Sequence, residues 1–118
     1  MKLKYSNLLK YVEKIFVGYK LSKKHAAISA KYLVDADFSG VNTHGLARVS
    51  MYCMRLKKKL IKAKPKIKIK KISSNVFHLD ADNSIGMVAA DMATDLLIQN
   101  TKKNGIVLVG VKNSGHYG

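Results

Sequence analysis

Residues 86–111 read GMVAADMATDLLIQNTKKNGIVLVGV, and this stretch decides the fold. Apolar residues recur in pairs every four positions through its first part, which predicts a helix that ends near Asn104 and Gly105. The pairs are Val88/Ala89, Met92/Ala93 and Leu96/Leu97. Residues 106–111 carry no polar side chain, and such a run is typical of a strand covered on both faces. The stretch therefore predicts a helix with a small-residue face that lies close on a sheet.

The segment before this helix contains two candidate strands. Pro65 ends a helical pattern, and residues 66–70 alternate Lys and Ile in the period of a half-buried strand. Residues 76–79 form a second short candidate, and residues 80–83 have the composition of a turn. We expect one face of the first strand to meet water.

The amino-terminal part predicts three helices. Ser6 precedes an apolar face that ends near Gly18, and Ser22 caps a second helix that should pack against the first as an antiparallel pair. Thr43 is the predicted cap of a third helix, which ends in the basic cluster 57–59. The apolar residues of this third helix are Leu46, Val49, Cys53, Leu56 and Leu60.

The predicted order is three helices, two short strands, a helix and a buried strand, which is typical of the α/β or the α+β class. Residues 1–64 form the helical segment, and residues 65–118 begin the α/β domain. A sheet covered on both faces requires neighbouring strands that this sequence barely supplies. The sheet is therefore expected to be incomplete.

Lysine dominates the charge of the chain. Its 118 residues include 22 basic and 7 acidic side chains, a formal net charge of +15, which suggests a nucleic-acid or other anionic partner. Only Arg48 and Arg55 are arginine, however, and the lysines are spread along the chain, whereas phosphate and base recognition depends on the forked guanidinium. Lysines at solvated positions are the favoured explanation, and a basic nucleic-acid-binding module is the alternative function.

Composition also sets an expectation for the compartment. No apolar run approaches the roughly 20 residues of a membrane-spanning helix, and no secretory signal follows Met1. The single Cys53 cannot form an internal disulfide, which is compatible with a reducing compartment. A cytoplasmic protein that is not embedded in a membrane is expected.

A first candidate site lies where a predicted loop becomes the third helix. His44 and Arg48 are four residues apart, so a helix that starts at Thr43 would place both side chains on one face. An imidazole that exchanges protons near neutral pH, beside a cation able to fork onto a carboxylate, suits an α-keto or α-hydroxy acid. The alternative is that His44 only caps the helix and Arg48 pairs with a surface acid.

A second candidate site is residues 113–118, which read NSGHYG and follow the predicted buried strand. Ligands bind at the carboxyl edge of covered α/β sheets, because loops there vary while strands hold their position. Two glycines flank His116 and permit a close backbone approach or unusual torsion angles. Asn113 and Ser114 could fix the tautomer of His116 by hydrogen bonding. The alternative is a glycine-rich turn with an incidental histidine.

Together these segments resemble the malate/L-lactate dehydrogenase family, which includes sulfolactate, ureidoglycolate and diketogulonate enzymes. The resemblance lies in three stretches in the family's order and spacing, and it extends over nearly the whole chain. They are FSGVNTHGLAR at 38–48, DADNSIG at 80–86 and GIVLVGVKNSGHYG at 105–118. Thr43 occupies a position where the family often has serine, which keeps the hydroxyl.

This resemblance implies an oxidoreductase that moves a hydride between the nicotinamide of NAD or NADP and C2 of a small 2-hydroxy or 2-oxo acid. It implies that His116 exchanges the substrate proton, with His44 as the alternative, and that Arg48 holds the substrate carboxylate. Thr43 and Asn113 would complete the substrate side. It also implies a non-Rossmann, mixed-sheet α/β/α domain, present here only in its amino-terminal part, and a homodimer at full length.

No cofactor-binding residues are assigned within this chain, and no metal site is expected. No G-x-G-x-x-G motif follows a strand, and the family resembled binds its dinucleotide mostly through residues that follow the matched part. Asp35 and Asp37 do not share a helical face, and the four histidines lack zinc-ligand spacing. His25 and His78 are interpreted as a solvated helix residue and an outward-facing strand residue. An inactive truncated remnant is a further alternative.

Overall fold

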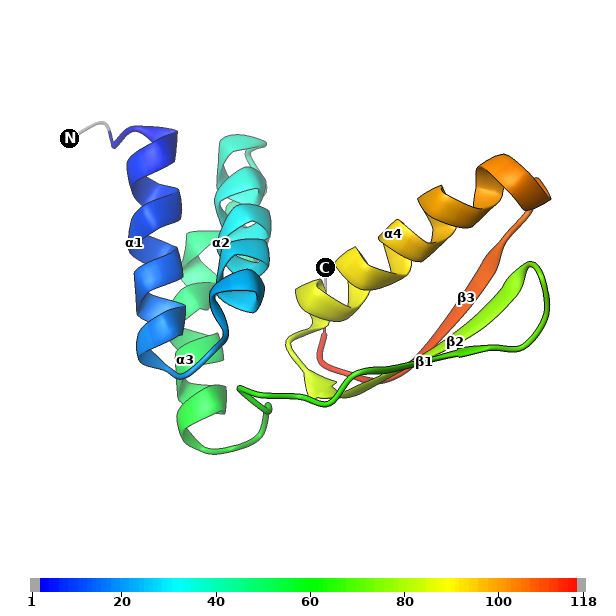
Figure 1. Cartoon of the computed structure of the whole chain (residues 1–118). Coiled ribbons are helices and arrows are strands. Elements are labelled where there is room, and N and C mark those ends of the chain that lie inside the picture. The colour runs from blue at the N-terminus through cyan, green and yellow to red at the C-terminus, as the bar shows by residue number, and fades with distance from the viewer. Residues whose placement is uncertain (1–2, 117–118) are drawn as a thin grey trace. The chain divides into compact units, whose positions relative to one another are not determined.

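The computed structural model describes residues 3–116. The chain divides between Lys64 and Pro65 into two compact units, one formed by helices and one by a sheet and a helix (Figure 1). None of the helices among these residues is both long and apolar enough to cross a membrane.

The first unit contains three helices: α1 (Tyr5–Gly18), α2 (Lys23–Phe38) and α3 (Val49–Lys57). As predicted, α1 and α2 pack side by side and run in opposite directions (Figure 1). Ser22 is the N-cap of α2, and its hydroxyl accepts a hydrogen bond from the His25 N–H at 3.2 Å, which confirms the predicted cap.

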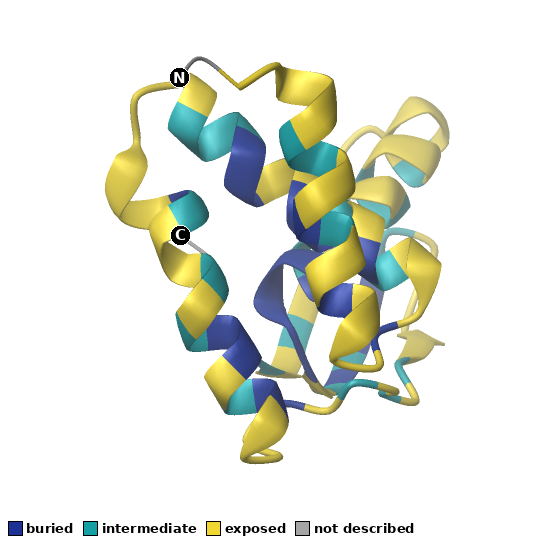
Figure 2. Ribbon diagram, turned by 90° about the vertical axis from the view of Figure 1, so that its left-hand side faces the viewer, coloured by how far each residue is buried: buried dark blue, intermediate teal, exposed yellow. Residues whose placement is uncertain are grey.

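Each helix of this unit buries only part of its surface. In Figure 2 the buried residues of the helices are interrupted by exposed ones, as expected for amphipathic helices with one buried face. The one buried polar residue of α2, Ser29, donates its hydroxyl hydrogen to the His25 carbonyl at 2.8 Å, so it enters the core with its hydrogen bond satisfied. The buried residues of α1 and α2 are Val12, Phe16, Ala26, Ser29, Ala30, Leu33 and Val34.

The prediction of one helix from Thr43 onward is wrong. Residues 42–48 form two short 3-10 turns, Asn42–His44 and Leu46–Arg48, and α3 begins only at Val49. The break occurs at Gly45, whose φ of −96° and ψ of −140° are not helical. Because α3 ends at Lys57, Leu60 also lies outside the helix, and it is 59% exposed.

The second unit contains a three-stranded sheet in the order β1 (Lys68–Lys71), β2 (Val76–Ser84), β3 (Leu108–Ser114). Strand β1 pairs antiparallel with β2, and β3 pairs parallel with it. Helix α4 (Gly86–Asn104) connects the two parallel strands. It ends at Gly105, which has a φ of +72°. The predicted mixed sheet and the predicted end of this helix are confirmed.

Helix α4 covers one face of the sheet through small side chains. Leu79 and Ala81 of β2 form a buried cluster with Ala89 and Ala93 of α4. Alanines on the helix allow its backbone to come close to the strands, which is what the small-residue pattern predicted. Partly buried residues surround this cluster, namely Ile67, Met92, Leu96, Val109 and Val111.

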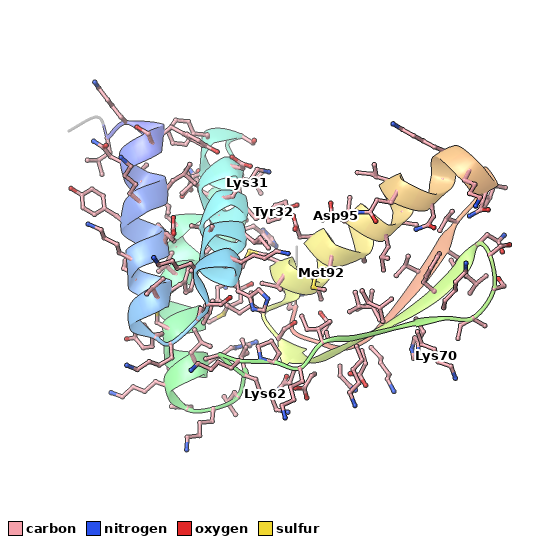
Figure 3. All side chains as sticks on the ribbon, in the orientation of Figure 1. Lys31, Tyr32, Lys62, Lys70, Met92 and Asp95 are labelled. Carbon is pink, nitrogen blue, oxygen red and sulfur yellow. The ribbon has the colours of Figure 1, made fainter. Side chains whose placement is uncertain are left out.

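The opposite face of the sheet corrects the prediction that β3 is covered on both sides. Val109 and Val111 face α4, whereas Leu108 is 63% exposed and Ile106, just before the strand, is 83% exposed. Strand register places His78 and Asp80 on this second face, beside Gly110 and Lys112. Figure 3 shows Lys70 on the side of the sheet away from α4. Among the described residues a helical layer covers one face only, and the second face of β3 is exposed.

Strand β2 also extends through the predicted turn at residues 80–83. Asp82 and Asn83 do adopt positive φ, of +46° and +59°, as turn-forming residues often do. The chain nevertheless continues in the sheet, and the register between β2 and β3 shifts between Asp80 and Ser84. The turn chemistry therefore produces an irregularity at the carboxyl end of β2.

Candidate active site

The loop that carries the first candidate residues is held together by Thr43. The Thr43 hydroxyl lies 3.0 Å from Nδ1 of His44. The Nε–H of Arg48 donates to the Thr43 carbonyl oxygen at 2.6 Å. The three side chains predicted for the substrate side of this loop thus belong to one hydrogen-bonded group, and His44 and Arg48 are both exposed.

The contact that connects His44 to Arg48 differs from the predicted one. His44 and Arg48 were expected to be neighbours on one helical face, but Gly45 separates them into two 3-10 turns. They are connected through Thr43 instead. A hydroxyl at Nδ1 orients the imidazole, and the bond from Nε fixes the plane of a guanidinium whose fork matches a carboxylate. The arrangement is chemically suited to holding a small carboxylic acid beside a titratable imidazole.

Asp37 anchors this loop and was missed as a site residue. Its Oδ2 accepts the Leu46 N–H at 2.6 Å. A β-carbon on Gly45 would lie 2.4 Å from the Asp37 Cγ, so the glycine allows the carboxylate to reach the turn. The sequence showed Asp37 only as a rejected metal ligand. Asp37 and Leu46 are nine residues apart, and no short sequence motif indicates a contact over that separation.

The second candidate residue, His116, follows the end of β3 at Ser114 by two residues. The Gly115 N–H donates to the Ser84 carbonyl at 3.1 Å, and the Ser114 hydroxyl donates to the Gly115 carbonyl at 2.7 Å. His116 is exposed and stands at the carboxyl end of the parallel pair β2 and β3. Tyr117 and Gly118 of the predicted motif lie outside the described residues.

Two glycines permit the close crossing that places His116. A β-carbon on Gly86 would lie 2.4 Å from the Gly115 carbonyl oxygen and 2.5 Å from that of His116. A β-carbon on Gly115 would lie 3.1 Å from the Ser84 oxygen. Real β-carbons do not approach backbone atoms at 2.4 Å, so residue 86 has to be glycine for this backbone path.

Asn113 is held by a carboxylate on the neighbouring strand. It has a φ of +53°, and its Nδ2 donates to Oδ1 of Asp80 at 3.0 Å. This hydrogen bond, together with the Asp82 N–H at 3.1 Å and Lys112 Nζ at 3.4 Å, lowers the pKa of Asp80 below its ordinary value. Asn113 therefore fixes the end of β3, and its predicted contact with substrate stays a prediction.

The start of α4 is the place where a strand-to-helix turn could receive a dinucleotide phosphate. Phosphate sites of this kind depend on backbone N–H groups that point outward from a helix N-terminus. Here the carbonyl oxygens of Gly115 and His116 lie against Gly86. Carbonyl oxygens disfavour an anion, so this helix N-terminus does not fit the phosphates of a dinucleotide. Among the same residues, no cluster of three or more His, Cys, Asp or Glu side chains could hold a metal ion.

Comparison with known proteins identifies relatives over the whole chain. A family model described as malate/L-lactate dehydrogenase matches residues 3–118. Ureidoglycolate dehydrogenase (NAD(+)) of Escherichia coli K12 is 33% identical over 118 residues, which are all of this chain and 34% of that protein. L-sulfolactate dehydrogenase of Methanocaldococcus jannaschii is 34% identical over the same length, again 34% of its own length.

Solved structures agree with this result. The sulfolactate dehydrogenase of Methanocaldococcus jannaschii superposes with a TM-score of 0.94 at 34% identity, over all of this chain and 34% of that one. The malate dehydrogenase of Pyrococcus horikoshii OT3 gives a TM-score of 0.94 at 27% identity, again over all of this chain and 34% of that one. The chain thus spans about a third of the length of the relatives it matches.

Proposed function

The chain belongs to the malate/L-lactate dehydrogenase family, and from this premise we propose that it carries the substrate-side residues of a 2-hydroxyacid dehydrogenase. The reaction is hydride transfer between a nicotinamide dinucleotide and C2 of a small 2-hydroxy or 2-oxo acid. The observation that carries the proposal is the hydrogen-bonded group of Thr43, His44 and Arg48 in one exposed loop. The chain spans about a third of the length of its relatives. The complete reaction is therefore proposed for a protein that also contains the part corresponding to the other two thirds of that length.

Arg48 is the proposed ligand of the substrate carboxylate. Its guanidinium plane is fixed by the bond from Nε to the Thr43 carbonyl. A guanidinium held in this way loses less freedom when a carboxylate binds to it, and a correctly held substrate presents C2 in one orientation. Thr43 contributes twice, since its carbonyl holds Arg48 and its hydroxyl lies beside the His44 ring.

The proposed proton-transfer residue is His116, with His44 as the second candidate. The acid or base must take the hydroxyl proton when the 2-hydroxy acid is oxidised and return it when the 2-oxo acid is reduced. His116 is exposed at the carboxyl end of a parallel strand pair, on a loop fixed by Gly86, Gly115 and Ser84. His44 has an oriented ring in the same loop as Arg48.

The nicotinamide cofactor accepts or donates the hydride when it is bound. Because the start of α4 does not fit a dinucleotide phosphate, no residue of this chain is proposed to hold it. The proposal includes both NAD and NADP. Family membership also leads us to expect a cytoplasmic homodimer for the complete protein.

The lysine-rich stretch has a structural explanation that does not favour a second function. All four residues of β1 are exposed, and three of them are lysines. Lysines on an edge strand discourage pairing with other sheets. The positive charge of this region is therefore accounted for without a nucleic-acid partner.

A chimera tests the proposed function. This chain would replace the matching first third of the Methanocaldococcus jannaschii L-sulfolactate dehydrogenase, and oxidation of NADH and NADPH would be followed with several small 2-oxo acids. We expect reduction of at least one acid. Arg48→Lys should raise KM for the acid about tenfold or more, since a bidentate charged contact contributes at least about 1.5 kcal/mol. Arg55→Lys is the matched control and should change little.

The same chimera separates the two histidines. His116→Asn is expected to lower kcat by about a hundredfold or more, as loss of a general acid or base does. His44→Asn should mainly raise KM. The opposite pattern would assign the proton to His44. A folded chimera that binds NADH but reduces no 2-oxo acid would refute the proposed function.

A further inference from the structure

We infer that Asp37 is a positioning residue that holds the loop of residues 42–48 in the conformation which presents His44 and Arg48. The inference deepens the proposed function and rests on it for the role of those two side chains. Its geometric part rests on contacts within the helical unit alone. The decisive contact joins the Asp37 carboxylate to the Leu46 N–H across nine residues of sequence.

The contact is short and specific. Asp37 Oδ2 and the Leu46 nitrogen are 2.6 Å apart, which is well within reach of a charge-assisted hydrogen bond. Leu46 begins the second 3-10 turn, which contains Arg48. The carboxylate therefore satisfies the first backbone N–H of the turn that carries Arg48, although it comes from the end of another helix.

The position of Asp37 in its own helix argues for a role outside that helix. It is the penultimate residue of α2, where the carbonyl end of the helix dipole disfavours negative charge. Asp35, two residues earlier, binds the Tyr5 hydroxyl and Lys31. Asp37 has the loop as its hydrogen-bond partner instead. An acid in this unfavourable place is explained by the bond to Leu46.

Gly45 is the steric counterpart of Asp37. It is buried, and a β-carbon there would lie within 2.7 Å of three atoms of the Asp37 carboxyl group. The carboxylate thus packs against the backbone at the point where the two turns meet. Loss of either feature would remove the same contact.

Further hydrogen bonds within the loop connect the Asp37 contact to His44 and Arg48. Backbone hydrogen bonds join the Arg48 N–H to the Gly45 carbonyl at 2.9 Å and the His44 N–H to the Val41 carbonyl at 3.0 Å. The Arg48 Nε–H bond to Thr43 then spans both turns. Apart from Gly45 and the half-buried Leu46, residues 42–48 are exposed. An exposed loop with few packed side chains depends on such bonds for its conformation.

Nuclear magnetic resonance of the 118-residue chain tests this inference without substrate or cofactor. The chain has two arginines, so its arginine Nε–H region contains Arg48 as the reporter and Arg55 as an internal control. Asp37→Ala should accelerate hydrogen exchange of the Leu46 amide at least tenfold and shift or broaden the Arg48 Nε–H signal. Asp37→Asn keeps an acceptor oxygen and should restore most of both signals.

Two further variants keep the result interpretable. Asp35→Ala removes a neighbouring acid from the same helix end and should leave Leu46 and Arg48 unchanged. Gly45→Ala should reproduce the effect of Asp37→Ala, because it displaces the carboxylate. Unchanged Leu46 exchange and an unchanged Arg48 signal in folded Asp37→Ala would overturn the inference. The same is true if Asp35→Ala produced an equal effect. Inactivity of the chimera would count against the proposed function and leave these signals unaffected.

Discussion

The Nδ2 of Asn113 donates a hydrogen bond to Oδ1 of Asp80 at 3.0 Å and so connects the last part of β3 to the middle of β2. The two residues are 33 positions apart in sequence. Asp80 Oδ1 also accepts a hydrogen bond from the Asp82 N–H, and Asp80 Oδ2 lies 3.4 Å from Lys112 Nζ. One carboxylate thus stabilises both irregular strand ends, just before the loop that carries His116.

This contact predicts a pH dependence of stability. The pKa of Asp80 is lowered in the folded chain, chiefly by Asn113, from an ordinary value of 3.8. The stabilisation is therefore complete above that value and is lost as the pH falls through the folded pKa. Asn113→Ala should make the free energy of unfolding less dependent on pH below about 4.5, as urea denaturation between pH 6 and 3 would measure.

Asn104 offers the matched control. Its Nδ2 donates to the Ser74 carbonyl at 2.8 Å, so it also joins distant parts of the same unit but has no acid as its partner. Asn104→Ala should lower stability by a similar amount at every pH. Equal pH profiles for the two variants would contradict the role of Asp80.

The crossing of Gly86 and Gly115 predicts a position that tolerates no side chain. Gly86→Ala should lower the free energy of unfolding by about 1–3 kcal/mol, because the new methyl group meets backbone oxygens that cannot rotate away. Gly18→Ala is the control, since a β-carbon there has nothing within 4 Å. It should be neutral or stabilise by up to about 1 kcal/mol. Thermal and chemical unfolding would measure both variants, and an equal stability of Gly86→Ala and Gly18→Ala would contradict the close crossing.

His25 predicts a loss of stability in mildly acidic solution. Burial, and secondarily the charge of Lys24, lower its pKa in the folded chain below the ordinary 6.5. The unfolded chain then binds the proton more readily, so stability falls as the pH drops below that value. His25→Gln should flatten the profile between pH 7.5 and 5, and Lys24→Gln should flatten it in part.

Ser22→Ala is a useful comparison for this experiment. It removes the N-cap that accepts the His25 N–H and should lower stability by about 1 kcal/mol. This loss should be the same across the pH range. A profile that stays steep in His25→Gln would show that other groups cause the acid sensitivity.

The two faces of the sheet predict different responses to the same substitution. Leu79 is fully buried under α4, so Leu79→Ala should lower the free energy of unfolding by about 2–5 kcal/mol. Leu108 lies on the other face and is largely exposed, so Leu108→Ala should change it by no more than about 0.5 kcal/mol. A large loss at Leu108 would indicate that this face is covered in solution.

Much of the secondary structure was predictable because it is encoded over short distances. The caps at Ser22 and Gly105 and the four-residue spacing of apolar side chains predict α1, α2 and α4 close to their observed bounds. The exception is the third helix, where Gly45 and Asp37 override a periodic pattern. The continuous apolar run at 106–111 likewise predicted a strand, which the structure places at Leu108–Ser114, but not its exposure.

The sequence named the residues of the candidate site but not the contacts among them. The motifs around His44, Arg48 and His116 indicate a family, because residue types and their order are properties of the sequence. Thr43 as the link between His44 and Arg48 follows from a broken helix that periodicity did not reveal. Asp37 and Asp80 act through contacts with residues nine and 33 positions away.

The sequence by itself therefore determined most of the helices and strands and the family, since local hydrogen bonding and apolar spacing involve residues a few positions apart. Only the tertiary structure decided which sheet face is covered, how the loop of residues 42–48 is held and why residues 45 and 86 are glycine. The physical reason is that each of these depends on the approach of distant backbone and side-chain atoms. Asp37 with Leu46, Asp80 with Asn113 and Gly86 with Gly115 come together only when the chain folds.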